Sequence, residues 1–582
     1  MKKKKRGFTL VELLAVIVIL AVILVIAVPR IMSVIKDAKL GSIESTAKLI
    51  ASTAESSYES KKALGLDVGD LKCTDVASLS NDYGTCKITF DDSGVATVVI
   101  NGKKGGKFDN LACQGTKDNM TCIEGEISTS RKCTTTDTLK YNLEFVDGQY
   151  TYTYNGYSGW HVKLTDKALT DPVTTELCGT INDKPIVNMV NMFKGSKATS
   201  IDVSSFDTSN VIYMGAMFSG SAATEIKGLE NFDTSKVTSM ASMFYQSAAT
   251  SLNLSSFDTS KVTNMRDMFS SSSATTLDLS SFDTSNVTDM SQMFYKSKAT
   301  SIDVSSFDTS NATDMIAMFQ ESAATSLNLS SFSTSKVTSM LRMFQSSTAT
   351  SIDLSSFDTS NVTDMSQMFF DSTATQVKGL ENFDTSKVTD MASMFAGTKV
   401  TSLDLSNFDT SNVTNMSNMF SQSKVTSLDL SSFDTSKVTN MSSMFSGSKA
   451  TSLDLSSFDT SKVTDMGAMF SGSAATEIKG LENFDTSKVT SMASMFGSTN
   501  VTSLDLSNYD TSNVTSMGWM FSWSKVTSLD LSSFDTSKVT DMSWMFQYSE
   551  ATTGYARSQE DADRFNASTT YRPSTLTFVV KS

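Results

Sequence analysis

The chain has 582 residues, a formal net charge of −14 and 39% hydrophobic residues. This length exceeds one ordinary domain, so several units are expected. The acidic balance disfavours nucleic acid and anionic membrane surfaces as partners and favours basic or cation-bridged ones. No cysteine follows Cys178 and His161 is the single histidine, so most of the chain lacks the side chains most used in catalysis and metal capture. We therefore expect no enzyme, no cofactor and no bound metal.

The N-terminus combines a basic cluster, Lys2 to Arg6, with an apolar run that ends at Val28. A helix from Phe8 to Val28 would be about 31 Å long, which is enough to cross a hydrocarbon core. The basic cluster is expected to stay in the cytoplasm, so the chain beyond the run faces outward. Glu12 lies inside the run, where a carboxylate costs about 3 kcal/mol on insertion scales, so we expect it to have a partner or a purpose.

A short motif opens this run. It consists of the basic cluster followed by Gly7, Phe8, Thr9, Leu10 and Glu12. The motif resembles the type IV prepilin leader. The resemblance implies that a prepilin peptidase cuts between Gly7 and Phe8, removing residues 1–7, and methylates the new amino terminus. It also implies that the Glu12 carboxylate pairs with the terminal amine of a neighbouring pilin subunit in a filament, and that Pro29 bends the long helix.

Two other interpretations of the N-terminus stay open. A removable secretory signal would end near Ala27, and a plain anchor helix would hold the chain in the membrane without assembly. The secretory interpretation leaves Glu12 unexplained. Beyond Pro29, apolar and charged residues continue at helical spacing, so residues 8–62 are expected to form one transmembrane and assembly helix.

Residues 63–180 contain short strand patterns and are expected to form a pilin-like head and the N-terminal cap of the next domain. One hairpin is predicted from Lys87 to Ile100 and another from Tyr141 to Tyr154. Both are expected to contribute to an antiparallel sheet packed on the helix. His161, which follows a tryptophan, is interpreted as a packing or surface residue.

All the cysteines fall in this head region. They are Cys73, Cys86, Cys113, Cys122, Cys133 and Cys178. An exported segment with an even number of cysteines indicates disulfides, although six cysteines allow fifteen pairings and the sequence cannot choose among them. Local closure favours pairing them in chain order. A zinc site is the alternative, but no two of these cysteines have the close spacing of zinc knuckles.

A phrase of 25 residues recurs over residues 181–552, and each copy carries one aromatic anchor. The anchors are Phe206, Phe232, Phe257, Phe282, Phe307, Phe332, Phe357, Phe383, Phe408, Phe433, Phe458, Phe484, Tyr509 and Phe534. The spacing becomes 26 where Lys-Gly-Leu-Glu-Asn precedes the anchor, which indicates one extra loop residue. The abundance of serine and threonine is also compatible with a disordered stalk, but the apolar periodicity argues against it.

Each copy is predicted to supply a strand and a short helix. In the copy around Phe257, Leu252 and Leu254 should point to one side of a strand, and the stretch from Val262 to Phe269 should be helical with its methionines in the core. Neither element can bury its apolar side alone, so the copies should stack. The methionine pairs are therefore interpreted as core rather than as copper or haem ligands.

The Leu-x-Leu strand and the Val-Thr-x-Met-x-x-Met-Phe half-repeat resemble the BspA-like leucine-rich repeats of bacterial surface proteins. The resemblance implies a curved solenoid used in adhesion or host-protein binding. The expected fold is thus an α+β N-terminal region followed by an α/β leucine-rich-repeat solenoid of about fourteen repeats with parallel strands. Residues 553–582 are expected to cap its last turn.

The outward position between the two strand leucines is predominantly acidic and marks a candidate ligand face. Its members are Asp278, Asp303, Asp353, Asp404, Asp429, Asp454, Asp505 and Asp530. Neighbouring strands lie about 4.8 Å apart, so these carboxylates are expected to raise one another's pKa or to attract cations, with calcium as a candidate. The face would bind a basic protein or a calcium-bridged glycan; the alternative is a solvated face that duplication merely copied.

These features together predict a pilin-like, minor subunit that passes through the cytoplasmic membrane and displays its solenoid at the cell surface. Its partners would be other pilin subunits, the prepilin peptidase and an extracellular protein or glycan. A tethered binding protein that never polymerises is the alternative. An exported glycosidase with a carboxylate pair is disfavoured because nearly identical repeats copy every acid many times, whereas catalysis needs one distinct pocket.

Overall fold

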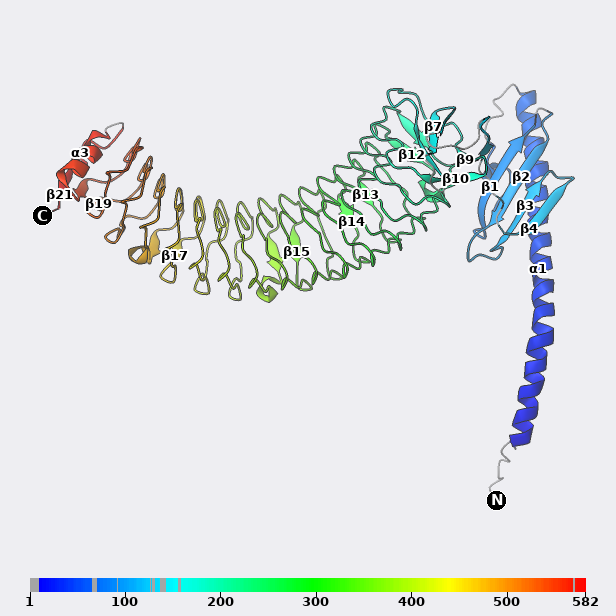
Figure 1. Ribbon diagram of the computed structural model, residues 1–582, viewed down its shortest axis with the longest axis horizontal. Helices are drawn as coiled ribbons and strands as arrows, with labels where there is room; N and C mark the ends of the chain where they lie inside the picture. Colours follow the sequence, from blue (N-terminus) through cyan, green and yellow to red (C-terminus); the bar gives the residue numbers. More distant parts are fainter. Residues whose placement is uncertain are drawn as a thin grey trace, which may run out of the picture. The chain divides into compact units, whose positions relative to one another are not determined.

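The computed structural model describes residues 10–64, 71–91, 93–125, 127, 131–136, 143–154, 159–568 and 571–581, with residues 10–32 described by their backbone alone. The chain divides into two compact units, Met1–Arg131 and Lys132–Ser582, which are taken separately (Figure 1).

The first unit packs a long helix against a four-stranded antiparallel sheet with strand order β1-β2-β3-β4. Its elements are α1 (Leu10–Ala63), α2 (Cys73–Val76), β1 (Tyr83–Phe90), β2 (Ala96–Gly102), β3 (Leu111–Gly115) and β4 (Met120–Glu124). On α1, Ile43, Ala47 and Ile50 are spaced to share one face, and all three are fully buried. Val98 and Ile100 of β2 are buried in the same cluster. The continuation of the helix to about residue 62 is confirmed.

The hairpin predicted around residues 87–100 is confirmed as β1 paired with β2. Its turn is organised by Asp91, whose Oδ1 accepts the backbone N–H groups of Ser93 and Val95 at 3.0 and 2.9 Å. Gly94 follows at φ +89°, a conformation that glycine adopts without steric cost.

The predicted membrane span, Phe8 to Val28, lies outside the residues whose side chains the structure describes. Within the described part of the chain, no helix combines the length and the apolar character needed to cross a membrane.

The second unit begins with a six-stranded sheet of order β5-β9-β10-β8-β7-β6. Its strands are β5 (Arg131–Cys133), β6 (Leu143–Asp147), β7 (Tyr150–Tyr154), β8 (Trp160–Leu164), β9 (Cys178–Ile181) and β10 (Lys184–Asn188). The predicted second hairpin is present as β6 and β7. The expectation that it joins the first hairpin in one sheet on the helix is wrong. Its buried Tyr150 and Tyr152 belong instead to the hydrophobic core that runs through the repeats.

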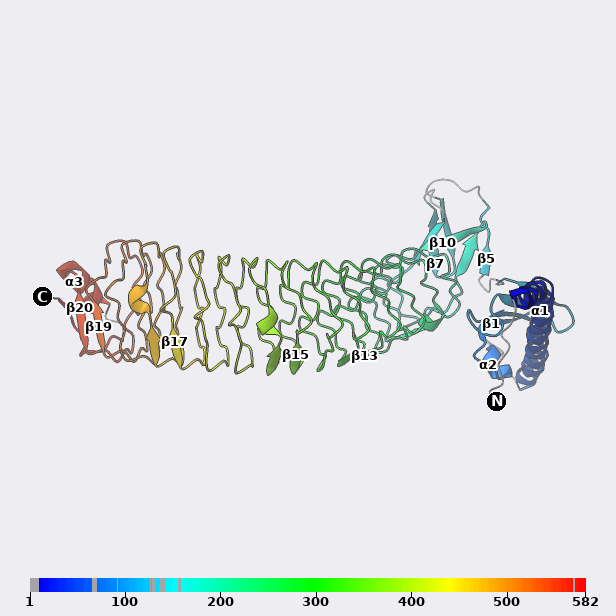
Figure 2. The ribbon, with the colours of Figure 1, turned by 90° about the horizontal axis from the view of Figure 1, so that it is seen from below.

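The repeats form a large parallel β-solenoid of about 17 turns. Its short strands are β11 (Ser200–Asp202), β12 (Glu225–Lys227), β13 (Thr276–Leu277), β14 (Ser301–Ile302), β15 (Ser351–Asp353), β16 (Gln376–Lys378), β17 (Ser452–Asp454), β18 (Glu477–Lys479), β19 (Ser528–Leu531), β20 (Thr553–Ala556) and β21 (Phe578–Val580). The turns outnumber the predicted repeats because Val173 pairs with Ile201 before the first anchor, while β20 and β21 continue the parallel pairing after the last. Figures 1 and 2 show successive turns side by side from β13 to β19.

The expected short helix in each copy is wrong. Residues Arg266 to Ser271 form turns, and alternate backbone N–H groups from Met265 onward donate to the next copy: Met265 to Asp289 O at 2.9 Å and Phe269 to Met293 O at 2.9 Å. Asp267 lies between the two methionines at φ +56°, which interrupts a right-handed helix. The leucine-rich α/β architecture is therefore not established, although the parallel strands and the methionine core are.

Stacked side chains of neighbouring turns form the solenoid core. The phenylalanine that follows each methionine pair lies over its neighbours, with Phe420 5.8 Å from Phe445 and 6.0 Å from Phe395 between ring centroids. A buried threonine in each copy links the backbones, as where Thr259 Oγ1 donates to Asp283 O at 2.8 Å. Each turn is thus held by the identical groups of the next one.

The predicted extra loop residue appears as a short 3₁₀ turn. The three turns are η1 (Leu229–Asn231), η2 (Leu380–Asn382) and η3 (Leu481–Asn483). Each follows a glycine at φ of +87° or +88°, and a Cβ on Gly228 would lie 2.3 Å from the Ser204 backbone. Only glycine fits at these positions.

The C-terminal segment covers the last turn, as predicted. Helix α3 (Gln559–Ala567) begins after Ser558 and packs Phe565 against Phe546 at 5.9 Å between centroids. The last core threonine, Thr536, has no following copy and donates instead to the buried carboxylate of Asp561 at 2.7 Å. The guanidinium of Arg564 donates to the Thr536 and Val539 carbonyls.

Candidate functional site

The predicted ligand face is the outward side of the short strands. In β15, Ile352 is buried while Ser351 and Asp353 are exposed. Parallel pairing places Asp353 beside Lys378 of the next copy, so outward residues form columns along the solenoid. The structure therefore brings the predicted aspartates onto one face, interrupted where Lys227, Lys378 and Lys479 precede the 3₁₀ turns.

We call the predicted ligand face, formed by these eight aspartates, the acidic face. Each of its aspartates organises a turn in its own copy. Asp429 Oδ1 accepts the Ser431 backbone N–H at 3.0 Å and the Ser431 hydroxyl at 2.6 Å. The backbone bond from the serine two residues on recurs in every copy of the set. An aspartate followed two residues later by a serine favours this local turn. The turn uses one carboxylate oxygen of each aspartate and needs no external ligand.

The expectation that stacking raises the pKa of these carboxyls is wrong. Hydrogen bonds from the serine hydroxyl and backbone lower the pKa of Asp404 and Asp429, and the repulsion of Asp429 on Asp404 is a minor opposing effect. The pKa is lowered in the same way for Asp278, Asp303, Asp353, Asp454 and Asp505. At Asp530, burial would raise the pKa, but the bonds from Lys581 and Ser532 outweigh it. Hydrogen bonding wins because its donors lie in contact, whereas the neighbouring charges are solvated.

Two copies carry asparagine at the position of the acidic face. Asn253 and Asn328 accept the same two bonds from the serine two residues on, with the hydroxyl at 2.8 Å in both cases. The negative charge of the aspartates is thus not required for the turn, and it is the property of the acidic face that a ligand could recognise.

Three disulfides join the cysteines in chain order, which are the pairs that local closure favoured. They are Cys73–Cys86, Cys113–Cys122 and Cys133–Cys178. Among the described residues, one group could offer three metal ligands: Asp147 with Cys133 and Cys178. Its two sulfurs are bonded to each other, so they are not thiolates and cannot bind a metal as such.

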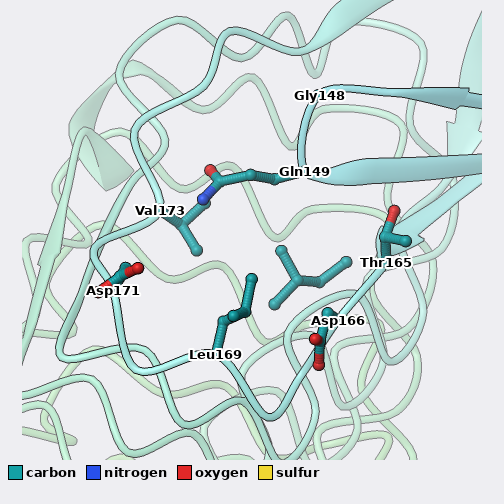
Figure 3. Close-up of a pocket in the computed structure, with 8 residues that line it drawn as sticks. Gly148, Gln149, Thr165, Asp166, Leu169, Asp171 and Val173 are labelled. Carbon is teal, nitrogen blue, oxygen red and sulfur yellow. The ribbon is translucent and has the colours of Figure 1, made fainter.

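His161 and a small cavity lie near the start of the second unit. His161 is half-buried, and its Nε2 lies 3.0 Å from the Val190 carbonyl. The cavity measures about 180 Å³ and is lined by Gly148, Gln149, Leu164, Thr165, Asp166, Leu169, Asp171 and Val173 (Figure 3). Its Gln149 amide already bonds to Pro172 O and Thr175 N, and ligand pockets are usually larger. We do not assign a site here.

The C-terminal turns carry an aromatic cluster that the sequence reasoning missed. Trp519 and Trp544 lie 4.6 Å apart between ring centroids, Trp523 and Tyr548 4.5 Å, and Tyr548 and Tyr571 5.2 Å. All five are among the exposed large hydrophobic residues of the described chain. The sequence does mark this cluster, because its tryptophans depart from the repeat: the preceding copy has serine at both positions.

The predicted processing and assembly residues cannot be placed. Gly7 and Phe8 lie outside the described residues, as do the side chains of Glu12 and Pro29.

Two family models match the chain. One is described as Mycoplasma protein of unknown function, DUF285, and matches residues 172–280, 221–330, 267–378, 370–479 and 473–568, which together span the solenoid. The other is described as the prokaryotic N-terminal methylation motif and matches residues 2–28. No curated protein and no solved structure matches the chain.

Proposed function

The chain belongs to the family described as Mycoplasma protein of unknown function, DUF285, and from that premise we propose that it is a type IV pilin-like subunit that displays a binding solenoid outside the cell. The observation that carries the proposal is the methylation motif over residues 2–28 on the same chain as the solenoid. A motif of this kind serves export and membrane attachment, and three disulfides fit an oxidising location.

At the N-terminus, a peptidase would cleave between Gly7 and Phe8 and methylate Phe8. The Glu12 carboxylate would then pair with the terminal amine of a neighbouring subunit, away from water, which would stabilise assembly and select the register. The long solenoid would crowd a filament if every subunit carried one, which supports a minor subunit. The resemblance to BspA-like surface repeats supports adhesion, although the copies lack the helix that this resemblance implied.

The processing step has a direct test. Gly7→Val should block cleavage, and the mature wild-type chain should begin at a methylated Phe8 when its N-terminus is read by mass spectrometry. A wild-type mature chain that begins at Met1 or Val28 would contradict the proposal.

Assembly is tested separately by Glu12→Leu. This variant should insert in the membrane more readily, because the buried charge is gone, but should be missing from sheared filaments. Asp37→Asn, which removes an exposed acid further along the same helix, is the matched control and should be incorporated normally. Undiminished incorporation of Glu12→Leu would leave the alternative function, a tethered binding protein that does not polymerise.

We place ligand binding on the acidic face, where a basic protein or a cation-bridged glycan would meet carboxylates from successive turns. Replacing Asp404, Asp429 and Asp454 together by asparagine should weaken adhesion and reduce its sensitivity to salt. The matched control is the asparagine triple of Asp409, Asp434 and Asp459, which lie in the same copies and make similar turns. Equal adhesion by both triples would place binding on another surface.

A further inference from the structure

The aromatic cluster near the C-terminal end of the solenoid is arranged in two columns. One column is Trp519 and Trp544, and the other is Trp523, Tyr548 and Tyr571. The centroid separations of 4.5 to 5.2 Å match the spacing of neighbouring strands, so the rings follow one another along the solenoid axis. Trp523 is 58% exposed and Trp519 43%.

Both columns begin abruptly. The copy before Trp519 and Trp523 has Ser494 and Ser498 at the equivalent positions, and the Ser494 N–H donates to Gly518 O while that of Ser498 donates to Ser522 O. Among the described residues, Trp519 and Trp523 each have a ring contact on the following side only. The next position of each column, on the side of the preceding copy, is therefore a serine rather than another ring. We call this feature the aromatic step, formed by Trp519, Trp523, Ser494 and Ser498.

Folding does not account for the aromatic step. The backbone at these positions has positive φ in every copy, for example +57° at Ser494 and +63° at Trp519, so it is set by the repeat and not by the tryptophans. The core of these turns is supplied by other rings, including Phe496 and Phe521, whose centroids lie 5.9 Å apart. Bulky side chains in a left-handed conformation at the surface are unusual, and a contiguous exposed apolar patch marks an interaction site.

We propose that the aromatic step binds a neutral pyranose-containing glycan, with an apolar sugar face on each indole and the sugar hydroxyls against the serine edge. The chemistry of the step matches such a ligand, because a pyranose has a flat face of C–H groups surrounded by hydroxyls, and an aromatic face attracts polarised C–H groups. Asp541 lies beside Gly518, next to the step, and offers further acceptor oxygens. This assignment rests on the proposed display of the solenoid and adds a second ligand site to the acidic face.

Charge selects among the molecules that stack on aromatic rings. The chain carries a net charge of −14, so nucleic acid and sialylated or sulfated sugars are repelled. A proline-rich peptide also docks on aromatic rings, but it uses a groove between them and needs few hydroxyl partners. Exposed indoles that follow serines in their columns favour the sugar.

The test uses the purified full chain in detergent. Binding is measured on an array of neutral oligosaccharides ending in galactose or glucose, with sialylated counterparts and a proline-rich peptide as rivals. Bound sugars are then titrated by tryptophan emission. Only four tryptophans are present and Trp160 is fully buried, so a ligand at the step changes the signal of the exposed ones.

Trp519→Ser with Trp523→Ser copies the side chains of the preceding turn and should keep the fold while lowering affinity by about tenfold or more. Tyr213→Ser, which removes a solitary tyrosine that is 47% exposed, should bind like the wild type. If the serine pair melts early, Trp519→Leu with Trp523→Leu retains apolar bulk without a ring and should also lose the sugar.

Three results would overturn the glycan site: unchanged affinity in the ring-less variants, no neutral sugar bound by the wild type, or capture of the peptide instead. Display is measured independently, by labelling intact cells that express the wild-type chain with an antibody against the repeats. A chain that binds sugar but never reaches the surface would overturn the proposed function and leave the glycan site standing, whereas display without sugar binding would do the reverse.

Discussion

The first unit and the solenoid retain their structures by different means. The first unit has a small core between α1 and the sheet, and two disulfides close loops with sequence separations of 13 and 9 residues. The solenoid beyond Cys178 has no cysteine, and each turn packs on near-copies of itself. A small domain needs cross-links because it buries too little surface, whereas repetition extends one core indefinitely. In the first unit, the contribution of a residue to stability depends on one particular partner. In the solenoid, it depends on whether the residue matches the residues at the same position in the neighbouring turns.

The largest effect is expected from a gap in the stacked core. Phe420→Ala should destabilise the protein by about 3–5 kcal/mol, because it removes a buried ring that contacts rings on both sides. Hydrogen exchange should locate the loss in turns around residue 420, since turns contact only their neighbours. Exposed Ser402→Ala is the control. A uniform loss of hydrogen-exchange protection in both units would contradict the difference drawn between them.

Removing a cross-link should act on the first unit alone. Replacing Cys73 and Cys86 together by serine should cost that unit about 3 kcal/mol, the value expected for a loop of this size. Chemical denaturation followed by proteolysis and mass spectrometry reports each unit separately. A matching shift in the solenoid transition would show that the two units unfold as one.

The C-terminal cap should be sensitive to Asp561, which takes the place of a missing next turn. Asp561→Ala leaves buried donors on Thr536 without an acceptor and should cost about 1–3 kcal/mol. Burial would raise the pKa of Asp561, but bonds from Ser558, Thr536 and Arg557 outweigh it and lower the pKa. The carboxylate's contribution is therefore present above its ordinary pKa of about 4 and is lost as pH falls through the lower folded value.

Thermal melts of wild type and Asp561→Ala from pH 7 to pH 2 check this sign. The difference between the two proteins should be constant above pH of about 5 and should shrink in acid. A difference that grows in acid would contradict the assigned role of the carboxylate.

A stabilising change is expected at the one copy whose aromatic anchor is not phenylalanine. Tyr509 occupies a position that is phenylalanine in the other copies, and its hydroxyl is buried without a hydrogen-bond partner. Tyr509→Phe should raise stability by about 1 kcal/mol, because it removes the cost of an unsatisfied buried hydroxyl. Phe534→Tyr, in the next copy, is the reciprocal variant and should lower it. If Tyr509→Phe instead lowers the stability, the Tyr509 hydroxyl makes a stabilising hydrogen bond.

The smallest stability effect is expected on the acidic face. Asparagine at positions 404, 429 and 454 keeps the turn, as Asn253 and Asn328 do, so the melting temperature at pH 7 should be equal or slightly lower. The wild-type pKa values are lowered, so the aspartates contribute above their ordinary pKa and lose that contribution in acid. The triple variant should therefore show a weaker acid destabilisation. A clear rise in melting temperature at pH 7 would mean that repulsion between turns outweighs the serine bonds.

Much of the architecture was predictable from residue patterns. The spacing of the aromatic anchors indicated stacked copies, and the Leu-x-Leu alternation indicated parallel strands. A spacing of 26 where the phrase Lys-Gly-Leu-Glu-Asn precedes the anchor indicated the extra residue. Local closure favoured the observed cysteine pairs, and the strand pattern from Lys87 to Ile100 predicted the first hairpin. These features depend on contacts close in sequence or on exact repetition, which a pattern records directly.

Tertiary structure alone decided the rest. Met265, Met268 and Phe269 have the spacing of a helical face, yet the backbone N–H groups of Met265 and Phe269 donate to the next copy. A residue with positive φ between the two methionines makes this possible while both methionines stay buried. The ring contacts of Trp519 and Trp523 on one side only depend on the aromatic side chains that the preceding turn lacks. A single sequence states which residues recur. Which groups meet, and on which side, is settled only when one turn lies against another.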